Sequence, residues 1–156
     1  MMRRVLFVCL GNICRSPLAK WIFLDQVKRS GDAFGADSCG IGSWHEGGPA
    51  DERSIRLAKR RGLVPEHVAR QVSPHTDFAG FDLLVGMDRA NLDALRRLGA
   101  PKPRVVLVRA FDPAFAGREP PEVPDPYQGS ERDFERVYDM LVPACAGLIE
   151  HLRGLR

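Results

Sequence analysis

The chain has 156 residues, of which 44% are hydrophobic and 28% are charged. This length suits one unit with a substantial buried core, and the composition excludes a disordered or collagen-like chain. The net charge of +3 is too small to indicate a polyanionic partner. We therefore expect a single globular domain over residues 1–156, with neither a nucleic acid nor a membrane as partner.

The N-terminal segment and the cysteines indicate the compartment. No apolar stretch approaches the ~20 residues that span a bilayer, and "VLFVCL" (5–10) is too short for a secretory signal. We therefore expect a cytoplasmic protein. The four cysteines show neither paired C-x-x-C spacing nor the density of a disulfide-stapled scaffold, so we expect neither a zinc site nor structural disulfides.

Apolar runs alternate with helical patterns in the first half of the chain. "RRVLFV" (3–8) indicates a strand, and "PLAKWIFLDQVKRSG" (17–31) indicates a helix with proline in its first turn and glycine at its end. The alternation returns as "AFGADSCGI" (33–41) and "ADERSIRLAKRRG" (50–62), where acidic residues precede basic ones as a helix dipole favours. These segments predict two strand–helix units.

The second half continues the same alternation. "FDLLVG" (81–86) indicates a buried strand, "MDRANLDALRRLG" (87–99) a helix capped by Asp88, and "RVVLV" (104–108) a fourth strand. Short strands rich in Val and Leu, separated by helices, are typical of a parallel sheet covered on both faces. We expect an α/β fold, a three-layer α/β/α sandwich with a four-stranded parallel sheet.

A long loop and a last helix complete the chain. Residues 109–129 hold five of the twelve prolines and no clear periodicity, which predicts a loop that is functional or mobile. From Ser130 a helical pattern continues to the C-terminus, and Pro143 is expected to kink it.

The loop "CLGNICRS" (9–16) joins the first strand to the first helix. Such a loop gathers backbone N–H groups at the positive end of a helix dipole, where phosphate binds. Gly11 permits a sharp turn, Asn12 tolerates a left-handed backbone, and Arg15 offers a planar fork to two phosphate oxygens. We expect the phosphate-binding residues to be Leu10, Gly11, Asn12, Ile13, Cys14, Arg15 and Ser16.

Cys9 stands where this loop begins. A helix N-terminus and a neighbouring cation favour the thiolate form, which would be a nucleophile aimed at phosphorus, and Ser16 is placed to donate a hydrogen bond to that sulfur. The loop lacks the G-x-x-x-x-G-K-[ST] and G-x-G-x-x-G patterns of nucleotide-binding loops. These absences argue against nucleotide and dinucleotide binding. The attack of a thiolate on phosphorus requires no metal, so we expect neither a cofactor nor a metal.

Two separated motifs resemble one known family. "VCLGNICRSP" (8–17) resembles the signature of the low-molecular-weight protein tyrosine phosphatases, and "DPY" (125–127) resembles their general-acid loop; "SWHEGGPADERS", "HVARQV" and "FDLLVGMDRANL" are similar to family segments in the expected order. The resemblance implies hydrolysis of phosphotyrosine and aryl phosphate monoesters through a cysteinyl-phosphate. It implies Cys9 as nucleophile, Arg15 as phosphate clamp and Asp125 as general acid, then base.

The resemblance also implies supporting roles. The positions that match a network fixing the phosphate loop are Asn12, Ser16, Ser38 and His67. The walls of the cleft would be Trp44 and Tyr127, whose rings can sandwich a phenyl phosphate. Cys14 would protect Cys9 by forming a disulfide on oxidation, while a buried packing thiol is the alternative.

The same resemblance sets expectations for partners. The substrate would be a phosphotyrosine protein, the whole chain a single phosphatase domain, and the assembly a monomer or weak homodimer. Relatives often carry a second tyrosine after the general-acid motif, where this chain has Gln128. The resemblance therefore does not extend to regulation by phosphorylation at that position, nor to the detailed substrate preference.

Three other functions remain as alternatives. A thioredoxin-linked arsenate reductase resembles this fold but relays a disulfide through two further cysteines, and residues 68–100 contain none. A non-catalytic phosphoprotein-binding module would need neither a nucleophile nor an acid. A scaffold unrelated to phosphate would leave the two motifs a coincidence.

Overall fold

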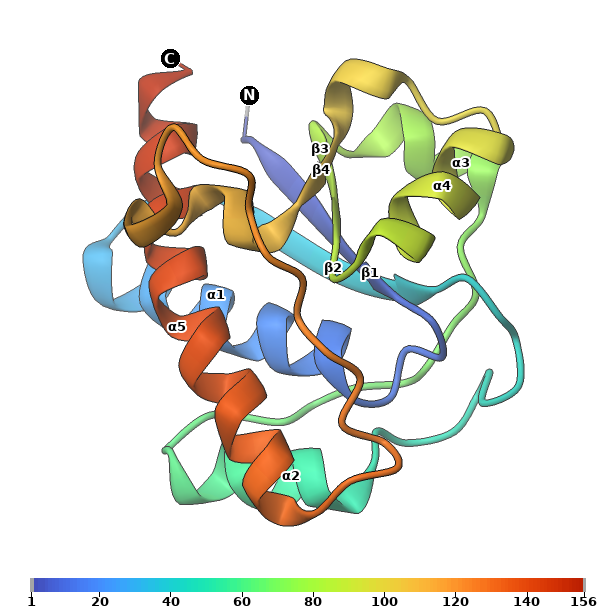
Figure 1. Cartoon of the computed structure of the whole chain (residues 1–156), viewed down its shortest axis with the longest axis vertical. Coiled ribbons are helices and arrows are strands. Elements are labelled where there is room, and N and C mark those ends of the chain that lie inside the picture. Colours follow the sequence, from blue (N-terminus) through green and yellow to red (C-terminus); the bar gives the residue numbers. More distant parts are fainter. Residues whose placement is uncertain (1, 156) are drawn as a thin grey trace.

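A parallel β-sheet runs through the centre of the computed structural model, which describes residues 2–155 (Figure 1). Its strands lie in the order β2-β1-β3-β4, and each neighbouring pair is parallel. The strands are β1 (Arg4–Cys9), β2 (Gly35–Gly40), β3 (Leu83–Gly86) and β4 (Val105–Leu107). The predicted four-stranded parallel sheet is confirmed.

Helices cover both faces of the sheet, which confirms the three-layer α/β/α sandwich (Figure 1). The helices packed on the first face are α1 (Arg15–Ser30), α2 (Glu52–Arg60) and α5 (Glu131–Gly154). The helices on the opposite face are α3 (Pro74–Gly80) and α4 (Arg89–Arg97). Side chains of β1 alternate between the two cores: Val5 and Phe7 face α1 and α5, whereas Leu6 and Val8 face the layer of α3 and α4.

Several local expectations are met by the structure. Gly31 ends α1 with a φ of 76°, and its N–H donates to Val27 O. Asp88 caps α4 in a reciprocal capping box with Asn91, and Ser130 caps α5 in the same way with Asp133. The helix α5 continues as one element through Pro143, and the kink expected there stays a prediction.

The structure contains elements that the sequence patterns did not predict. The helix α3 begins at a proline and buries Phe78 in the second core, but its seven residues are too few for a helical period to be read. The predicted loop over 109–129 contains short 3₁₀ turns, η2 (Val108–Phe111) and η3 (Pro113–Phe115), and a further turn, η1 (Lys102–Arg104), precedes β4. Such turns of three or four residues carry no periodic signal.

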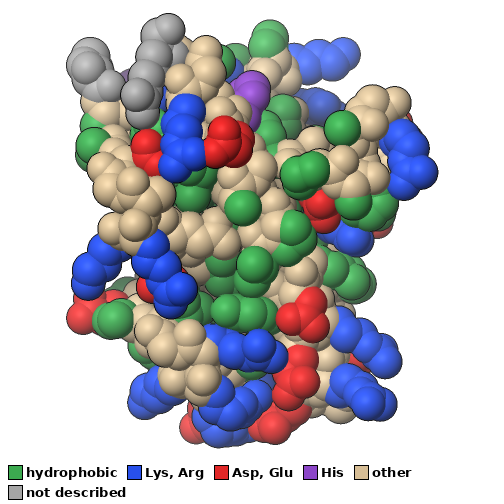
Figure 2. Space-filling view, turned by 90° about the vertical axis from the view of Figure 1, so that its left-hand side faces the viewer, with side chains coloured by type: hydrophobic (Ala, Val, Ile, Leu, Met, Phe, Trp, Pro, Cys, Tyr) green, Lys and Arg blue, Asp and Glu red, His purple; other side chains and the backbone are tan. Residues whose placement is uncertain are grey.

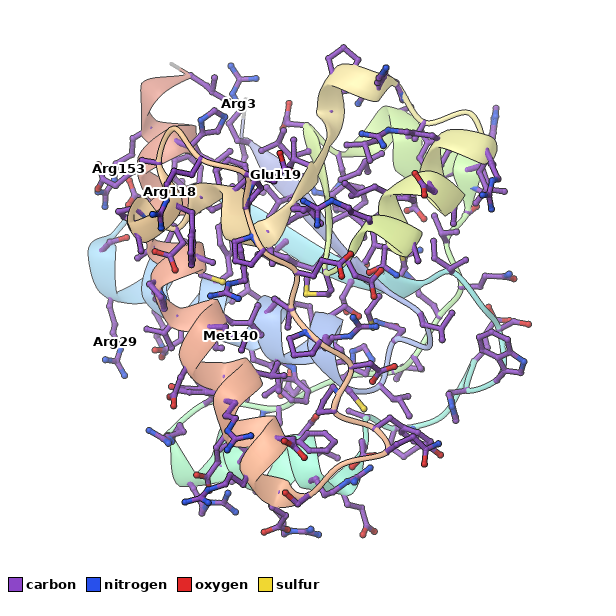
Figure 3. All side chains as sticks on the ribbon, in the orientation of Figure 1. Arg3, Arg29, Arg118, Glu119, Met140 and Arg153 are labelled. Carbon is purple, nitrogen blue, oxygen red and sulfur yellow. The ribbon has the colours of Figure 1, made fainter. Side chains whose placement is uncertain are left out.

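The two chain ends meet at the edge of the sheet opposite to the loop of residues 9–16. Arg3 Nη2 donates a hydrogen bond to Leu155 O at 2.7 Å, and Figure 3 shows Arg3 and Arg153 at this end of the molecule. One face, seen in Figure 2, carries basic and acidic side chains side by side at its lower end, in accord with the small net charge. No helix within residues 2–155 is long and apolar enough to cross a membrane.

The topology creates a crevice at the carboxyl ends of the strands. The chain leaves β1 to form β2 on one side and later returns to form β3 on the other. At such a switch point the loops after neighbouring strands diverge and leave room for a ligand. The loop after β1 begins here and lines the cleft, together with residues from the segment after β2 and from the loop before α5. The segment that follows β3 also begins here and contributes Asp88, which contacts Arg15.

Candidate active site

The loop of residues 9–16 is held by its carbonyl oxygens. The donors are Ile41 N for Cys9 O, Gly42 N for Leu10 O, His67 Nε2 for Asn12 O, Asp51 N for Ile13 O and Ser54 Oγ for Cys14 O, at 2.8 to 3.3 Å. These donors surround the loop from outside. In a planar trans peptide the N–H points opposite to the C=O, so the N–H groups that follow these carbonyls are directed into the loop. The result is a concave ring of donors suited to an anion.

Asn12 stabilises the turn of this loop. It has a φ of 60°, the left-handed region that asparagine tolerates, and among residues 2–155 no other non-glycine residue has a positive φ. Its buried amide donates to Ser16 Oγ at 2.8 Å and Ser38 Oγ at 3.0 Å, and its Oδ1 accepts from Arg70 N at 2.9 Å. Hydrogen bonds on every side of the amide therefore offset the backbone strain.

Gly11 does not have a left-handed backbone, and its nearest neighbour outside the loop is the exposed side chain of His45. Its φ is not positive, but a Cβ atom there would lie 3.2 Å from His45 Cδ2. The expectation of a left-handed backbone at Asn12 is confirmed; the sharp turn expected at Gly11 stays a prediction.

His67 supports the loop from below through one defined tautomer. Its Nε2 donates to Asn12 O at 2.8 Å, and its Nδ1 lies 3.0 Å from Lys20 Nζ. Because an ammonium group only donates, Nδ1 must accept and the ring must be neutral. Burial, with the neighbouring charge of Lys20, lowers the pKa of His67 to about 4.

Cys9 lies at the floor of the loop, at the carboxyl end of β1. It is 2% exposed, and its Sγ is 3.0 Å from Ser16 Oγ. Ser16 Oγ also accepts from Asn12, so its own proton points either to the sulfur or to the more distant Cys39 O at 3.5 Å. The hydroxyl is placed to stabilise a negative sulfur.

Arg15 begins α1, and its guanidinium is enclosed at the edge of the same cleft. Only 2% of its side chain is exposed, and Nη1 donates to Asp88 Oδ2 at 2.7 Å and to Val123 O at 2.9 Å. Burial alone would lower the pKa of Arg15, but Cys9, Asp88 and Asp125 together raise it. The cation is thus held in one orientation by groups from two other segments.

Asp88 is a site residue whose second role the sequence analysis missed. Besides capping α4 through Oδ1, which accepts from Asn91 N at 2.9 Å, it orients Arg15 through Oδ2. The available signal was its position directly after the third strand. Because parallel strands end at one edge of the sheet, that position places it beside the loop after the first strand.

The cleft above Cys9 has apolar walls. Its lining includes Leu10, Ile13, Trp44 and Tyr127, together with the side chain of His45. Trp44 is 71% and Tyr127 45% exposed, so both rings stand at the mouth of the cleft. The sequence analysis did not single out His45, which lies next to Trp44 and gave no motif of its own.

Asp125 lies on the rim of the same cleft, more than a hundred positions along the chain from Cys9. Its Oδ1 accepts from Tyr127 N at 3.1 Å, and its Oδ2 is 3.7 Å from Arg15 Nη2. With 44% of its side chain exposed, it is accessible to solvent. A carboxyl group here faces whatever binds above the sulfur.

Cys14 is buried under the loop near a carboxylate. Its Sγ lies 4.0 Å from Asp51 Oδ2 and is placed to donate to it, and burial together with Asp51 raises the pKa of this thiol. All four cysteines are free. Among residues 2–155 no three His, Cys, Asp or Glu side chains are grouped as the ligands of a metal ion would be.

Comparison with known proteins agrees with this geometry. Residues 4–155 match the family model described as low molecular weight phosphotyrosine protein phosphatase. A Streptomyces coelicolor low molecular weight protein-tyrosine-phosphatase is 44% identical over 156 residues, covering 96% of this chain and 93% of the relative. Low molecular weight protein-tyrosine phosphatase A of Mycobacterium tuberculosis is 42% identical over 146 residues, covering 92% and 88%.

The solved structures give the same result. The crystal structure of YfkJ from Bacillus subtilis superimposes with a TM-score of 0.90 at 34% identity, covering all of this chain and 98% of its own. The chain belongs to the low molecular weight phosphotyrosine protein phosphatase family.

Proposed function

We propose that the protein hydrolyses phosphotyrosine monoesters on protein substrates in two steps. In the first, the Cys9 thiolate attacks phosphorus while the bond to the phenolic oxygen breaks, and Asp125 gives its proton to that oxygen. In the second, Asp125 takes a proton from a water that attacks the cysteinyl-phosphate. The sulfur leaves as thiolate, stabilised by Ser16 at 3.0 Å, and inorganic phosphate is released.

The observation that carries this proposal is the shared cleft of Cys9, Arg15 and Asp125. The outward carbonyls of the loop direct N–H donors at the phosphate oxygens, and Arg15 adds a buried cation fixed by Asp88. Such preorganised donors stabilise the charge spread over the equatorial oxygens in the transition state. Asp125 supplies the proton that a phenolate leaving group needs.

The walls of the cleft support an aromatic ester as substrate. Trp44 and Tyr127 flank the mouth, and Leu10 and Ile13 of the phosphate loop add apolar surface to the lining of the cleft. A phosphotyrosine ring spans this apolar zone, whereas phosphoserine is too short to fill it while its phosphate reaches Cys9. We therefore expect phosphotyrosine peptides to be preferred over matched phosphoserine peptides.

Turnover separates this proposal from a phosphate-binding module. We would measure hydrolysis of p-nitrophenyl phosphate and a phosphotyrosine peptide, with chelator and reductant present, by the parent, Cys9→Ser and Asp125→Ala. We expect metal-independent turnover that Cys9→Ser abolishes. Asp125→Ala should retain bound phosphopeptide but turn over slowly. Absence of turnover by folded, reduced parent protein would instead favour the binding module, with arsenate the next ligand to try.

We also propose that Cys14 is the redox partner of Cys9. Peroxide would oxidise the Cys9 thiolate to a sulfenic acid, and attack by Cys14 sulfur would form the disulfide and release water. In this step the proton of the Cys14 thiol leaves with the departing hydroxide as water. Peroxide-treated parent should regain activity under dithiothreitol, and Cys14→Ala should regain much less. Equal recovery would contradict the protective role.

Three further proposals concern the whole molecule. We propose that residues 1–156 form a single phosphatase domain, supported by two cores that share one sheet. We propose a cytoplasmic location, supported by four free cysteines, among them Cys9, whose proposed role needs a reduced thiol. A monomer or weak homodimer is our proposal for the assembly, which sedimentation at several concentrations tests.

A further inference from the structure

We propose that Arg53 is the positioning residue for the general acid, holding the loop of Asp125 above the phosphate loop. The inference rests on the proposed function, in which Asp125 protonates the leaving group. Arg53 lines neither the cleft nor the phosphate loop. It acts through the backbone that carries Asp125.

The guanidinium of Arg53 binds two carbonyl oxygens of residues 125–129, the segment called the acid loop below. Arg53 lies in the first turn of α2; its Nη2 donates to Tyr127 O at 3.0 Å and its Nη1 to Gly129 O at 3.1 Å. Both carbonyls follow Asp125 closely in the chain. A planar fork with several N–H donors in fixed directions is suited to two such acceptors at once.

The same side chain is fixed to the phosphate loop through Asp51. Arg53 Nε donates to Asp51 Oδ1 at 3.0 Å, and Nη2 to Asp51 Oδ2 at 2.9 Å. Asp51 N in turn donates to Ile13 O at 2.9 Å. Burial tends to raise the pKa of Asp51, but the hydrogen bonds from Arg53 hold it below its usual range, so this carboxylate is ionised. A continuous chain of contacts therefore joins the phosphate loop to the acid loop.

Ring packing holds the guanidinium plane in place. Its carbon lies 4.3 Å from the centroid of the Phe134 ring and 5.8 Å from that of Tyr127. Phe134 is 1% exposed in the first core, so it is a rigid base at the start of α5. These contacts are ones that a lysine at position 53 would not reproduce.

The acid loop needs the support of Arg53 on the C-terminal side of Asp125. Before Asp125, the segment is anchored at buried Val123, whose N–H donates to Met87 O at 2.8 Å and whose carbonyl accepts from Arg15. After Asp125, Arg53 supplies the bonds from outside the loop to Tyr127 and Gly129. Asp125 is thus suspended between two anchors, and loss of one frees its carboxyl group to move away from the leaving oxygen.

The basicity of the leaving group separates a role through Asp125 from a merely structural role, because a structural defect would lower kcat/KM for all esters alike. Phenyl phosphate releases a phenolate whose conjugate acid has a pKa of about 10, so its departure requires proton transfer. The phenolate of 2,4-dinitrophenyl phosphate is a far weaker base and departs unassisted. We expect Arg53→Met and Arg53→Lys to lower kcat/KM for phenyl phosphate roughly tenfold, and for the dinitrophenyl ester by less than about twofold.

Arg56 offers a matched control on the same helix. It pairs with Glu52 and Glu131 at the surface, and neither partner is in the loop that carries Asp125. Arg56→Met removes a similar cation from α2 and should leave both kcat/KM values within about twofold of the parent. Circular dichroism and urea unfolding would test whether each variant is folded. If Arg53→Met does not fold, Arg53→Lys is used for the comparison.

A double-mutant cycle with Asp125→Asn completes the test. If Arg53 acts through Asp125, the Arg53 substitution has no further effect on phenyl phosphate hydrolysis once Asp125 is asparagine. Equal losses for both esters, or additive losses in the double variant, would overturn the inference and leave the role of Asp125 intact. If Asp125→Asn alone left phenyl phosphate hydrolysis unchanged, the proposed acid itself would be wrong.

Discussion

The carboxylate of Asp88 connects Arg15 to helix α4. One oxygen accepts from Arg15 Nη1 at 2.7 Å, and the other accepts from Asn91 N at 2.9 Å in the cap of that helix. The start of a helix on the opposite face of the sheet therefore helps to set the orientation of the Arg15 guanidinium.

Replacing Asp88 by asparagine separates these two roles. Asparagine caps helices about as well as aspartate, so α4 should remain intact while Arg15 loses its charged partner. A hydrogen bond between charged groups contributes about 1.5–3 kcal/mol, so we expect kcat/KM to fall ~10- to 100-fold and inhibition by inorganic phosphate to weaken. The exposed Asp93→Asn on the outer side of α4 is the control. A parent-like Asp88→Asn would show that Arg15 is oriented without this contact.

Ser16 should assist the departure of sulfur from the phosphoenzyme. Its hydroxyl is 3.0 Å from Cys9 Sγ, and a neutral hydrogen bond contributes about 0.5–1.5 kcal/mol. Ser16→Ala should therefore slow dephosphorylation about two- to tenfold, and a burst of p-nitrophenolate should appear in stopped-flow measurements. Ser38→Ala removes another hydroxyl from Asn12 without touching Cys9, and it should show no such burst. A burst of equal size in both variants would indicate a general loosening of the loop.

His67 should make the protein less stable in acid. Its pKa is about 4 in the folded protein and about 6.5 in an unfolded chain. Between these values the unfolded chain binds more protons, so the contribution of this residue to the free energy of unfolding falls as the pH is lowered from 6.5 toward 4. His67→Gln, whose amide also donates to a carbonyl but does not titrate, should lose less stability between pH 7 and pH 5 in urea unfolding.

Lys20 provides an independent check on the same contact. Removing its ammonium group with Lys20→Met leaves the burial of His67 in place but removes the neighbouring positive charge. The substitution leaves Arg70 and Asp37 in place. The pKa of His67, followed by NMR of the ring, should rise. A ring that titrates near 6.5 in the parent would contradict the lowered pKa of His67.

A side chain at position 147 should destabilise the fold, because it would clash with the backbone at Phe111. A Cβ atom at this position of α5 would lie 1.7 Å from Phe111 O, whereas a Cβ at Gly154 of the same helix meets nothing within 4 Å. We expect Gly147→Ala to lower the free energy of unfolding by about 1–3 kcal/mol through overpacking. Gly154→Ala should be neutral or slightly stabilising, because alanine is the better helix former. Urea unfolding of the two variants checks the contrast.

Local sequence patterns were sufficient for much of the molecule. The strands, most helices and the cap at Asp88 depend on periodicity and on side chains a few positions apart, which the chain order itself displays. The loop of residues 9–16 could likewise be recognised because its glycine, asparagine, arginine and serine act within one strand–helix connection. The family resemblance added Asp125, which no local pattern connects to Cys9.

The tertiary structure decided which distant residues support the loop of residues 9–16 and the segment that carries Asp125. The second role of Asp88, the hydrogen bonds of Arg53 to the acid loop and the pairing of Lys20 with His67 each join segments far apart in the chain. A side chain such as Arg53 has many surface partners available to it, and only packing on Phe134 and the path of the last loop select these. The sequence by itself thus determined the chemistry of the site, and the packing of α2, α4 and α5 around one edge of the sheet determined how that chemistry is held in place.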